Sequence, residues 1–400
     1  MAENTLNLSC SFCGKKRSQV EKLIVGDGSA VCNECVDLCS NILSKERNDK
    51  LRRDSNISHK LNPVQIKTHL DQHVIGQDHA KIALSVGVVN HFKRMYFKPE
   101  VSVEKSNILM FGPSGSGKTL LVKKVAEYLD IPFVIADATT LTEAGYVGED
   151  VESVINRLFT EADYDVERCQ QGIVFLDEID KISRKSESAT LTRDVSGEGV
   201  QQALLKLVEG TKCRISTTAS KKHPNLEQIE IDTGKILFIA GGAFTDIDDI
   251  IAKRQSNRGI GFAASVYNTS VDRSSVEPDD FVRFGMIPEF TGRFPVITHT
   301  SELTKEDLIA ILTNTKNSLV RQMQFYFEVD GIALTFTDDA IDYIAEQAIK
   351  LNVGARGLKN ILERILNPYM FGISALKEEQ IEELTIDLKT VKYSITKEKN

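Results

Sequence analysis

The chain has 400 residues, enough for two or three domains that each bury a core. Hydrophobic residues make up 41% and charged residues 26%, with a formal net charge of -8, which argues against a dedicated nucleic-acid coat without excluding a local basic groove. No apolar run approaches the roughly 20 residues that span a bilayer, and the opening MAENTLNLSC lacks the pattern of a signal peptide. We expect a cytoplasmic protein; an organellar one after presequence removal is the alternative.

Four cysteines begin the chain as two C-x2-C pairs, CSFC and CNEC, separated by eighteen residues. In zinc sites of this spacing each pair contributes two thiolates to a tetrahedron, and four thiolates leave no open position for catalysis. The pattern therefore predicts a structural zinc ion in a module over residues 1–46, with reduced, unpaired thiols as the alternative. The predicted ligands are Cys10, Cys13, Cys32 and Cys35. We predict that Cys39, four residues after Cys35, is not a ligand.

A polar segment separates the cysteines from the rest of the chain. Residues 44–60, SKERNDKLRRDSNISHK, are dense in charge, which is typical of a flexible tether. A charged exposed helix is the alternative. We place the linker at residues 47–61, a large domain at 62–298 and a smaller, mainly helical domain at 299–400.

Predicted strands and helices alternate through the large domain. Short apolar runs predict buried strands at 107–111, 133–139, 173–177 and 236–240. A helix expected from about Glu149 has one apolar face, formed by Val151, Val154, Ile155, Leu158 and Phe159. This alternation predicts an α/β fold with a parallel sheet covered by helices on both faces. A late strand is expected within ELTIDLKT, residues 383–390.

The segment GPSGSGKT fits the phosphate-binding pattern G-x-x-x-x-G-K-[ST], with a predicted strand before it and a predicted helix after it. Its glycines allow backbone N–H groups to surround phosphate oxygens, and the helix N-terminus adds positive potential. We expect Lys118 to reach the β- and γ-phosphates of ATP and Thr119 to coordinate Mg²⁺. The predicted nucleotide-binding residues here are Gly112, Pro113, Ser114, Gly115, Ser116, Gly117, Lys118, Thr119 and Leu120.

The segment IVFLDEID delivers two carboxylates to the end of a predicted strand. Asp177 can hold the Mg²⁺ shell, and Glu178 is then placed to polarise a water molecule against the γ-phosphate. The alternative, two solvated acids, fits poorly beside the phosphate-binding motif, so the sequence favours hydrolysis over simple binding. Arg293, in GRF, and Arg356, in GARGL, are candidates for stabilising the transition state, although each alone is typical of a surface residue.

Taken together, these motifs resemble those of the ClpX family of AAA+ protein unfoldases, and the resemblance covers nearly the whole chain. It implies an AAA+ P-loop domain, a small C-terminal domain and a homohexamer with ATP sites at subunit boundaries. It implies that Val74 and Ile75, in HVIGQ, contact adenine. It also implies that Arg293 reaches the ATP of a neighbouring subunit and that Arg356 reports the nucleotide state to the small domain.

The resemblance also explains an apparently exposed aromatic residue in AGYVGED, where glycines flank Tyr146 and Val147. It implies that these two residues line an axial pore and pull on a polypeptide, with glycines permitting large backbone movement. Two further loops match the family. The family usually has Arg-Lys-His in its pore-entrance loop, and here Lys221 keeps the charge without the guanidinium fork. The pore residues implied in these loops are Arg193, Asp194, Lys221, Lys222 and His223.

A long polar segment contains GIGF, which presents apolar residues between glycines. Local packing is the ordinary explanation, but the resemblance implies that Ile260, Gly261 and Phe262 dock on the ClpP peptidase ring. It further implies that the zinc module dimerises and receives adaptors or degradation-tagged substrates. The resulting expectation is an ATP-driven unfoldase and chaperone that feeds a peptidase and has no peptidase activity of its own.

Two other functions use the same motifs. An AAA+ motor on nucleic acid would use the zinc module as a DNA reader; the acidic net charge and the weakly charged GYVG loop argue against it. A non-catalytic scaffold would use zinc and nucleotide only to hold an oligomer together, and Glu178 argues against that.

Overall fold

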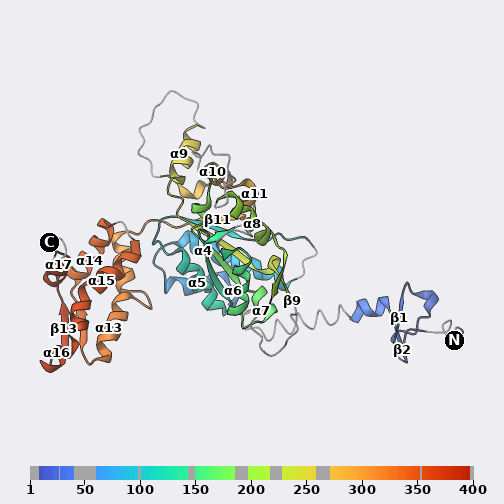
Figure 1. The fold of residues 1–400 in the computed structure, drawn as a ribbon, viewed down its shortest axis with the longest axis horizontal. Coiled ribbons are helices and arrows are strands. Elements are labelled where there is room, and N and C mark those ends of the chain that lie inside the picture. Colours follow the sequence, from blue (N-terminus) through green and yellow to red (C-terminus); the bar gives the residue numbers. More distant parts are fainter. Residues whose placement is uncertain are drawn as a thin grey trace. The chain divides into compact units, whose positions relative to one another are not determined.

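The computed structural model describes residues 9–26, 28–39, 60–97, 101–142, 149–184, 197–216, 228–257, 271–351 and 354–396 (Figure 1). The chain forms two compact units: residues 1–60 with 96–98, and residues 61–95 with 99–400. Within the described residues, no helix has the length and apolar character needed to cross a membrane.

The first unit is built around a small β-hairpin. Strand β1 (Leu23–Gly26) pairs antiparallel with β2 (Ser29–Cys32), a short 3-10 helix, η1 (Arg17–Gln19), precedes them, and residues 33–39 are helical. Its buried cluster consists of Cys10, Cys32 and Cys35, which pack with the partly buried side chains of Val20, Leu23 and Val31. Cysteine sulfurs thus occupy the centre that larger apolar side chains fill in bigger domains.

The second unit contains a five-stranded parallel sheet in the order β11-β3-β10-β7-β4. The strands are β3 (Ile108–Phe111), β4 (Phe133–Asp137), β7 (Ile173–Asp177), β10 (Leu237–Gly242) and β11 (Val296–His299). All residues of β3 and β10 are buried, as expected for strands covered on both faces. The register aligns Phe111 with both Gly242 and His299, so three strands end at one level.

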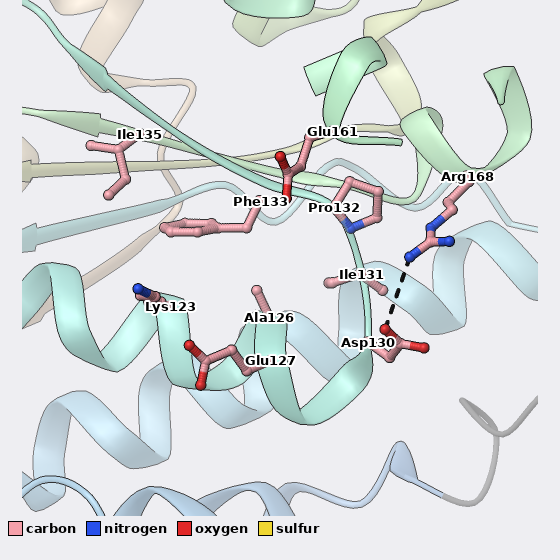
Figure 2. Close-up of a pocket in the computed structure, with 10 residues that line it drawn as sticks. All are labelled: Lys123, Ala126, Glu127, Asp130, Ile131, Pro132, Phe133, Ile135, Glu161 and Arg168. Atoms are coloured by element: carbon pink, nitrogen blue, oxygen red, sulfur yellow. Dashed lines mark ion pairs between the residues drawn. The ribbon is translucent and has the colours of Figure 1, made fainter. Parts of the chain in front are cut away.

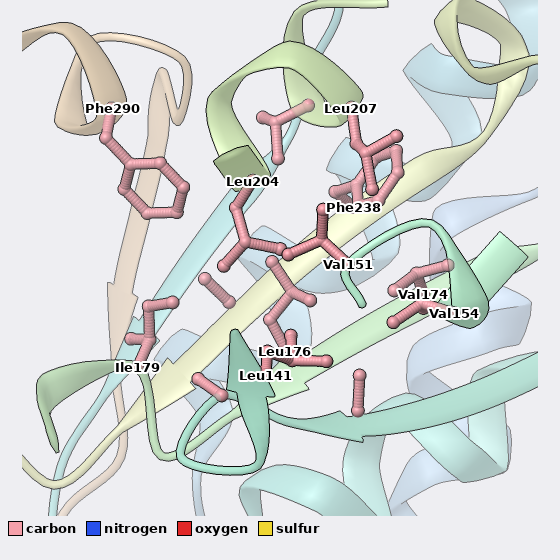
Figure 3. Close-up of a cluster of buried hydrophobic side chains, with 14 of the residues drawn as sticks. Leu141, Val151, Val154, Val174, Leu176, Ile179, Leu204, Leu207, Phe238 and Phe290 are labelled. Atoms are coloured by element: carbon pink, nitrogen blue, oxygen red, sulfur yellow. The ribbon is translucent and has the colours of Figure 1, made fainter. Parts of the chain in front are cut away.

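Helices cover both faces of this sheet. Alternate residues of β3 point to opposite faces: Leu109 and Phe111 join the core beneath α6 and α8, whereas Ile108 lies against Gly87 of α4. Figure 3 shows Leu204 and Leu207 of α8, with Phe238 of β10 and Leu176 of β7, gathered in this core. The helices of this region are α3 (Pro63–Asp71), α4 (Asp78–Tyr96), α5 (Lys118–Leu129), α6 (Ser153–Glu161), α7 (Val166–Gln170), α8 (Glu198–Glu209), α9 (Ile247–Asn257), α10 (Pro278–Phe284) and α11 (Pro288–Thr291).

This domain also contains shorter strands and 3-10 helices. Strand β5 (Leu141–Thr142) pairs with β6 (Glu149–Asp150), and β8 (Lys212–Ser216) forms a hairpin with β9 (Gln228–Asp232). The 3-10 helices are η2 (Ile179–Ile182), η3 (Thr233–Lys235) and η4 (Arg273–Ser275). The apolar face predicted for the helix after Glu149 is buried, but α6 begins only at Ser153, because Glu149 and Asp150 pair as β6.

From Lys305 onward the chain forms a mainly helical small domain with its own core. Its helices are α12 (Lys305–Thr313), α13 (Leu319–Val329), α14 (Asp338–Lys350), α15 (Gly354–Phe371), α16 (Ile373–Glu378) and α17 (Leu388–Thr396). The predicted late strand is confirmed as β13 (Glu383–Ile386), and it pairs in parallel with β12 (Ala333–Phe336), which the sequence analysis did not anticipate.

Candidate functional site

The four predicted zinc ligands come together in the first unit. The Sγ atoms of Cys10, Cys13, Cys32 and Cys35 all lie within 4.8 Å of one another, and those of Cys13 and Cys32 are 3.7 Å apart. A tetrahedral zinc ion with Zn–S bonds of about 2.3 Å requires S···S separations of roughly 3.8 Å, so the residues fit this metal. Burial acts to raise the pKa of Cys10, but backbone N–H donors, chiefly those of Cys13 and Cys32, outweigh burial and lower it to about 6. A thiolate is thereby favoured.

The phosphate loop between β3 and α5 has a backbone that only glycine adopts readily. Gly112, Gly115 and Gly117 have φ angles of 140°, 75° and 99°. A side chain at Gly112 would also collide with the carbonyl of Thr300. The sequence therefore specifies the course of the loop, which leads directly into the first turn of α5.

Lys118 lies buried within this loop. Its ammonium donates to the carbonyl oxygens of Gly112 at 2.6 Å and Pro113 at 2.8 Å. Burial lowers the pKa of Lys118 to about 8, against the opposing effect of Asp177 and Asp180. A phosphate oxygen would supply the negative charge that this buried ammonium lacks among its carbonyl partners.

An oxygen cluster lies at the end of β7. Thr119 Oγ1 donates to Asp177 Oδ2 at 3.1 Å, and Asp177 Oδ1 accepts from the backbone N–H of Glu178 at 3.0 Å. A hydroxyl and a carboxylate are ligands that Mg²⁺ accepts. Glu178 has a φ of 55°, so the chain turns sharply after Asp177 and places the second carboxylate outside the strand.

A cavity of about 380 Å³ adjoins the phosphate loop. Val74 and Ile75 lie in its wall together with Gly115 and Gly117, and the small domain supplies apolar side chains of its own. The small-domain lining residues are Leu303, Ile311, Thr315, Asn317, Leu319, Gln322 and Ala355. Apolar walls beside a phosphate loop suit the flat aromatic faces of a base such as adenine.

The segment that carries Val74 is fixed on two sides. The buried ammonium of Lys81 donates to Val74 O and to Asp71 Oδ1, both at 2.7 Å. Gln77 exchanges two hydrogen bonds with the backbone of Ser301, at 2.9 and 2.7 Å. The segment is thus held to the connection between β11 and α12, which leads into the small domain.

The two arginine candidates lie in different surroundings. Arg356 is exposed in the first turn of α15, whose start contacts the phosphate loop through Ala355 N to Gly115 O at 3.4 Å. Arg293 is exposed and pairs with Glu209, with Nη2 and Nε at 2.6 and 2.8 Å from Oε1. Within one chain, therefore, Arg293 is held by an acid of the same domain.

The predicted pore and docking residues lie outside the described residues: Tyr146, Val147, Arg193, Asp194, Lys221, Lys222, His223, Ile260, Gly261 and Phe262. The elements that flank them are described. Strands β5 and β6 flank the first pore loop, the β8–β9 hairpin flanks the entrance loop, and α9 and η4 flank the docking loop. These assignments stay predictions.

A second cavity, of about 500 Å³, lies between α5 and the edge strand β4 (Figure 2). Phe133 and Ile135 of β4 lie on the side of the cavity opposite α5, which contributes Ala126, and Arg168 pairs with Asp130 at 3.9 Å. None of the predicted site residues lines it. We assign the nucleotide to the smaller cavity because that one borders the phosphate loop.

Two features of the site are not evident from the sequence: the small-domain wall of the nucleotide cavity and the contact that Thr300 makes with the phosphate loop. Thr300 Oγ1 lies 2.7 Å from Ser116 Oγ, and its backbone N–H donates to Phe111 O at 2.8 Å. No local pattern marks this threonine, since its role follows from the pairing of β11 with β3.

Comparison with known proteins assigns a family to each part of the chain. Residues 8–45 match the ClpX C4-type zinc finger, residues 103–297 the AAA domain (Cdc48 subfamily) and residues 303–385 the C-terminal, D2-small domain, of ClpB protein. The chain is also similar to the ATP-dependent Clp protease ATP-binding subunit ClpX of Treponema denticola, with 47% identity over 100% of this chain and 98% of that protein.

Proposed function

Because the chain belongs to the ClpX family of AAA+ ATPases, we propose that it is an ATP-dependent unfoldase and translocase that feeds proteins to a ClpP peptidase ring. The observation that carries this proposal is the nucleotide cavity, whose walls come from both the large and the small domain. A change at the phosphate loop therefore acts on two domains at once, which is what conversion of ATP hydrolysis into movement requires.

In the proposed reaction, Lys118 leaves its carbonyl partners for the phosphates. Thr119 and Asp177 would hold Mg²⁺, which would neutralise charge on the phosphate oxygens. Glu178 accepts a proton from the attacking water, because its carboxylate comes directly after the residue that holds the metal.

The proposed assembly is a homohexamer in which Arg293 exchanges Glu209 for the ATP of a neighbouring subunit. Arg356, at the start of α15, reports the nucleotide to the small domain, since that helix begins against the phosphate loop. The pairing of Arg293 with Glu209 is an exposed one and costs little to break.

The proposed path of the substrate uses the remaining loops. Tyr146 and Val147 grip the polypeptide in the pore, while the residues of the second pore loop and of the basic entrance loop contact it on the way. The zinc module dimerises and receives adaptors or tagged substrates. Acting without the peptidase, the same unfolding cycle would serve as a chaperone activity.

The link to the peptidase is tested by substituting Phe262. Phe262→Ala is expected to retain ATP turnover and ATP-dependent unfolding while losing degradation, because only the apolar docking contact is removed. Peptide release from a tagged substrate in the presence of ClpP measures degradation, and Val329→Ala, which truncates an exposed apolar side chain of the small domain, serves as the control. Degradation at the wild-type rate by Phe262→Ala would reject the docking assignment.

A further inference from the structure

A row of polar side chains lies behind the phosphate loop, at the carboxyl end of β11. Thr300, the first residue after this strand, is buried and touches the loop at three points. Its hydroxyl meets Ser116 Oγ at 2.7 Å, its N–H donates to Phe111 O, and its carbonyl occupies the space beside Gly112. The position of Thr300 therefore determines where the phosphate loop lies.

Two histidines lie next to this contact: His299 is the last residue of β11, and His79 is on α4. The rings of His79 and His299 are stacked, with centroids 4.5 Å apart and planes inclined by 26°. His79 Nδ1 lies 3.0 Å from Thr298 Oγ1, which joins the start of α4 to β11. His299 Nδ1 is buried and has no hydrogen-bond partner among the described residues, whereas His79 is exposed and open to solvent protons.

The charged groups around this pair come from three elements. Asp272 and Arg273 lie on and beside η4, Asp248 lies on α9, and Glu302 follows the strand. Arg273 pairs with Asp248 at 2.6 Å and donates to Thr300 O at 3.3 Å. Burial, then His79 and Arg273, lower the pKa of His299 below its ordinary value of 6.5, while Asp272 and Asp248 oppose this. His299 is accordingly neutral at pH 7.5.

We propose that His299, stacked on His79, is a proton-sensitive positioning residue, which holds the phosphate loop in place while neutral and releases it when protonated. A proton on His299 Nδ1 would create a buried N–H without an acceptor, next to the ring of His79. This change favours separation of the rings. Separation moves Thr298 and Thr300, and with them Ser116, so that phosphate binding weakens as the pH falls through the lowered pKa of His299.

This inference concerns the nucleotide site and requires none of the pore, docking or assembly assignments. Its test uses the full chain, Mg²⁺ and a fluorescent ADP analogue, with dissociation constants measured at pH 7.5 and pH 5.8. The matched protein is the double variant His79→Gln/His299→Gln, in which neither side chain titrates. Other groups also titrate over this interval, namely His73, which lines the cavity, and the nucleotide phosphates. They do so equally in both proteins, so their effects cancel when the change in dissociation constant of the wild type is divided by that of the variant.

We expect the wild type to lose more affinity than the double variant over this interval, by up to about fivefold, which is the limit for one group with a pKa at or below 6.5 that must be neutral for binding. Loss of affinity by the same factor in both proteins would overturn the inference. Failure of the wild type to bind nucleotide at pH 7.5 would contradict the nucleotide site itself.

A second variant tests the connection through Thr300 and does not depend on the folding of the first. Thr300→Val removes the hydroxyl at Ser116 but leaves both histidines. The melting temperature of the nucleotide-free variant should still fall with pH as in the wild type, while the pH dependence of its ADP affinity should flatten. The control Thr335→Val removes a similar hydroxyl from the exposed pair with Thr385 and should change neither measurement. A full wild-type pH dependence of affinity in Thr300→Val would overturn the proposed connection.

Discussion

At the scale of single residues, the proposed hydrolysis depends on two neighbouring carboxylates, Asp177 and Glu178, that have different partners. Asp177 is engaged by Thr119 and by the N–H of Glu178, which suits it to hold a metal ion. Glu178→Gln keeps the size of the side chain but removes the base, so we expect ATP turnover to fall about 10²–10⁴-fold with nucleotide binding retained. Phosphate release measures turnover, and Glu161→Gln, an exposed acid on α6, is the control. Undiminished turnover would remove Glu178 from its role.

The ammonium of Lys118 makes nucleotide binding sensitive to alkaline pH. Burial lowers the pKa of Lys118 to about 8, and bound phosphate would favour the charged form and raise it. Between pH 7 and pH 9, affinity for ADP should therefore be highest at the lower end and fall as the pH rises through 8, by up to about tenfold per pH unit. Lys118→Arg stays charged and should show a flatter profile between pH 7 and pH 9. Parallel profiles for the two proteins would contradict this assignment.

At the scale of elements, the hairpin β1–β2 and the helical residues 33–39 depend on their thiolates, because three cysteines are the buried centre of the unit. Cys32→Ser should therefore abolish zinc binding and unfold this unit, since a module of this size cannot bury enough core without metal. Metal analysis and amide NMR spectra measure the two effects. Cys39→Ser, outside the sulfur cluster, should retain about one zinc ion per chain. Retention of zinc by Cys32→Ser would contradict the four-thiolate site.

Some features of the fold and of the nucleotide site can be predicted from the sequence, and others cannot. The strand at Ile173–Asp177 could be predicted from a short apolar run. The loop from Gly112 to Thr119 could be predicted because its backbone conformation requires glycine at particular positions. By contrast, Ile311 and Leu319 belong to ordinary apolar helical patterns, and nothing local reveals that they face the phosphate loop. Their proximity is created by tertiary packing over nearly two hundred residues. Thr300 was missed for the same reason.

At the scale of the whole molecule, one nucleotide cavity is shared by two domains, and the connection between them starts at Thr300. Folded proteins are stabilised by roughly 5–15 kcal/mol, so forced unfolding calls for repeated cycles of hydrolysis that pull at one end of a substrate. The loop proposed to pull connects β5 to β6, and the proposed entrance loop connects β8 to β9, all in the large domain. We therefore propose that ATP hydrolysis and the pulling of substrate use the same folded domain.

The most direct test of this account follows the fluorescence of a stable fluorescent protein that carries an unstructured degradation tag. The wild-type chain with ATP and ClpP should abolish the signal, because unfolding destroys the chromophore environment. Tyr146→Ala should hydrolyse ATP yet leave the fluorescence intact, since it lacks the side chain proposed to grip the polypeptide. Loss of fluorescence that requires both ATP and Tyr146 is the predicted result. A signal that persists with the wild type despite measurable ATP hydrolysis would contradict the proposed function.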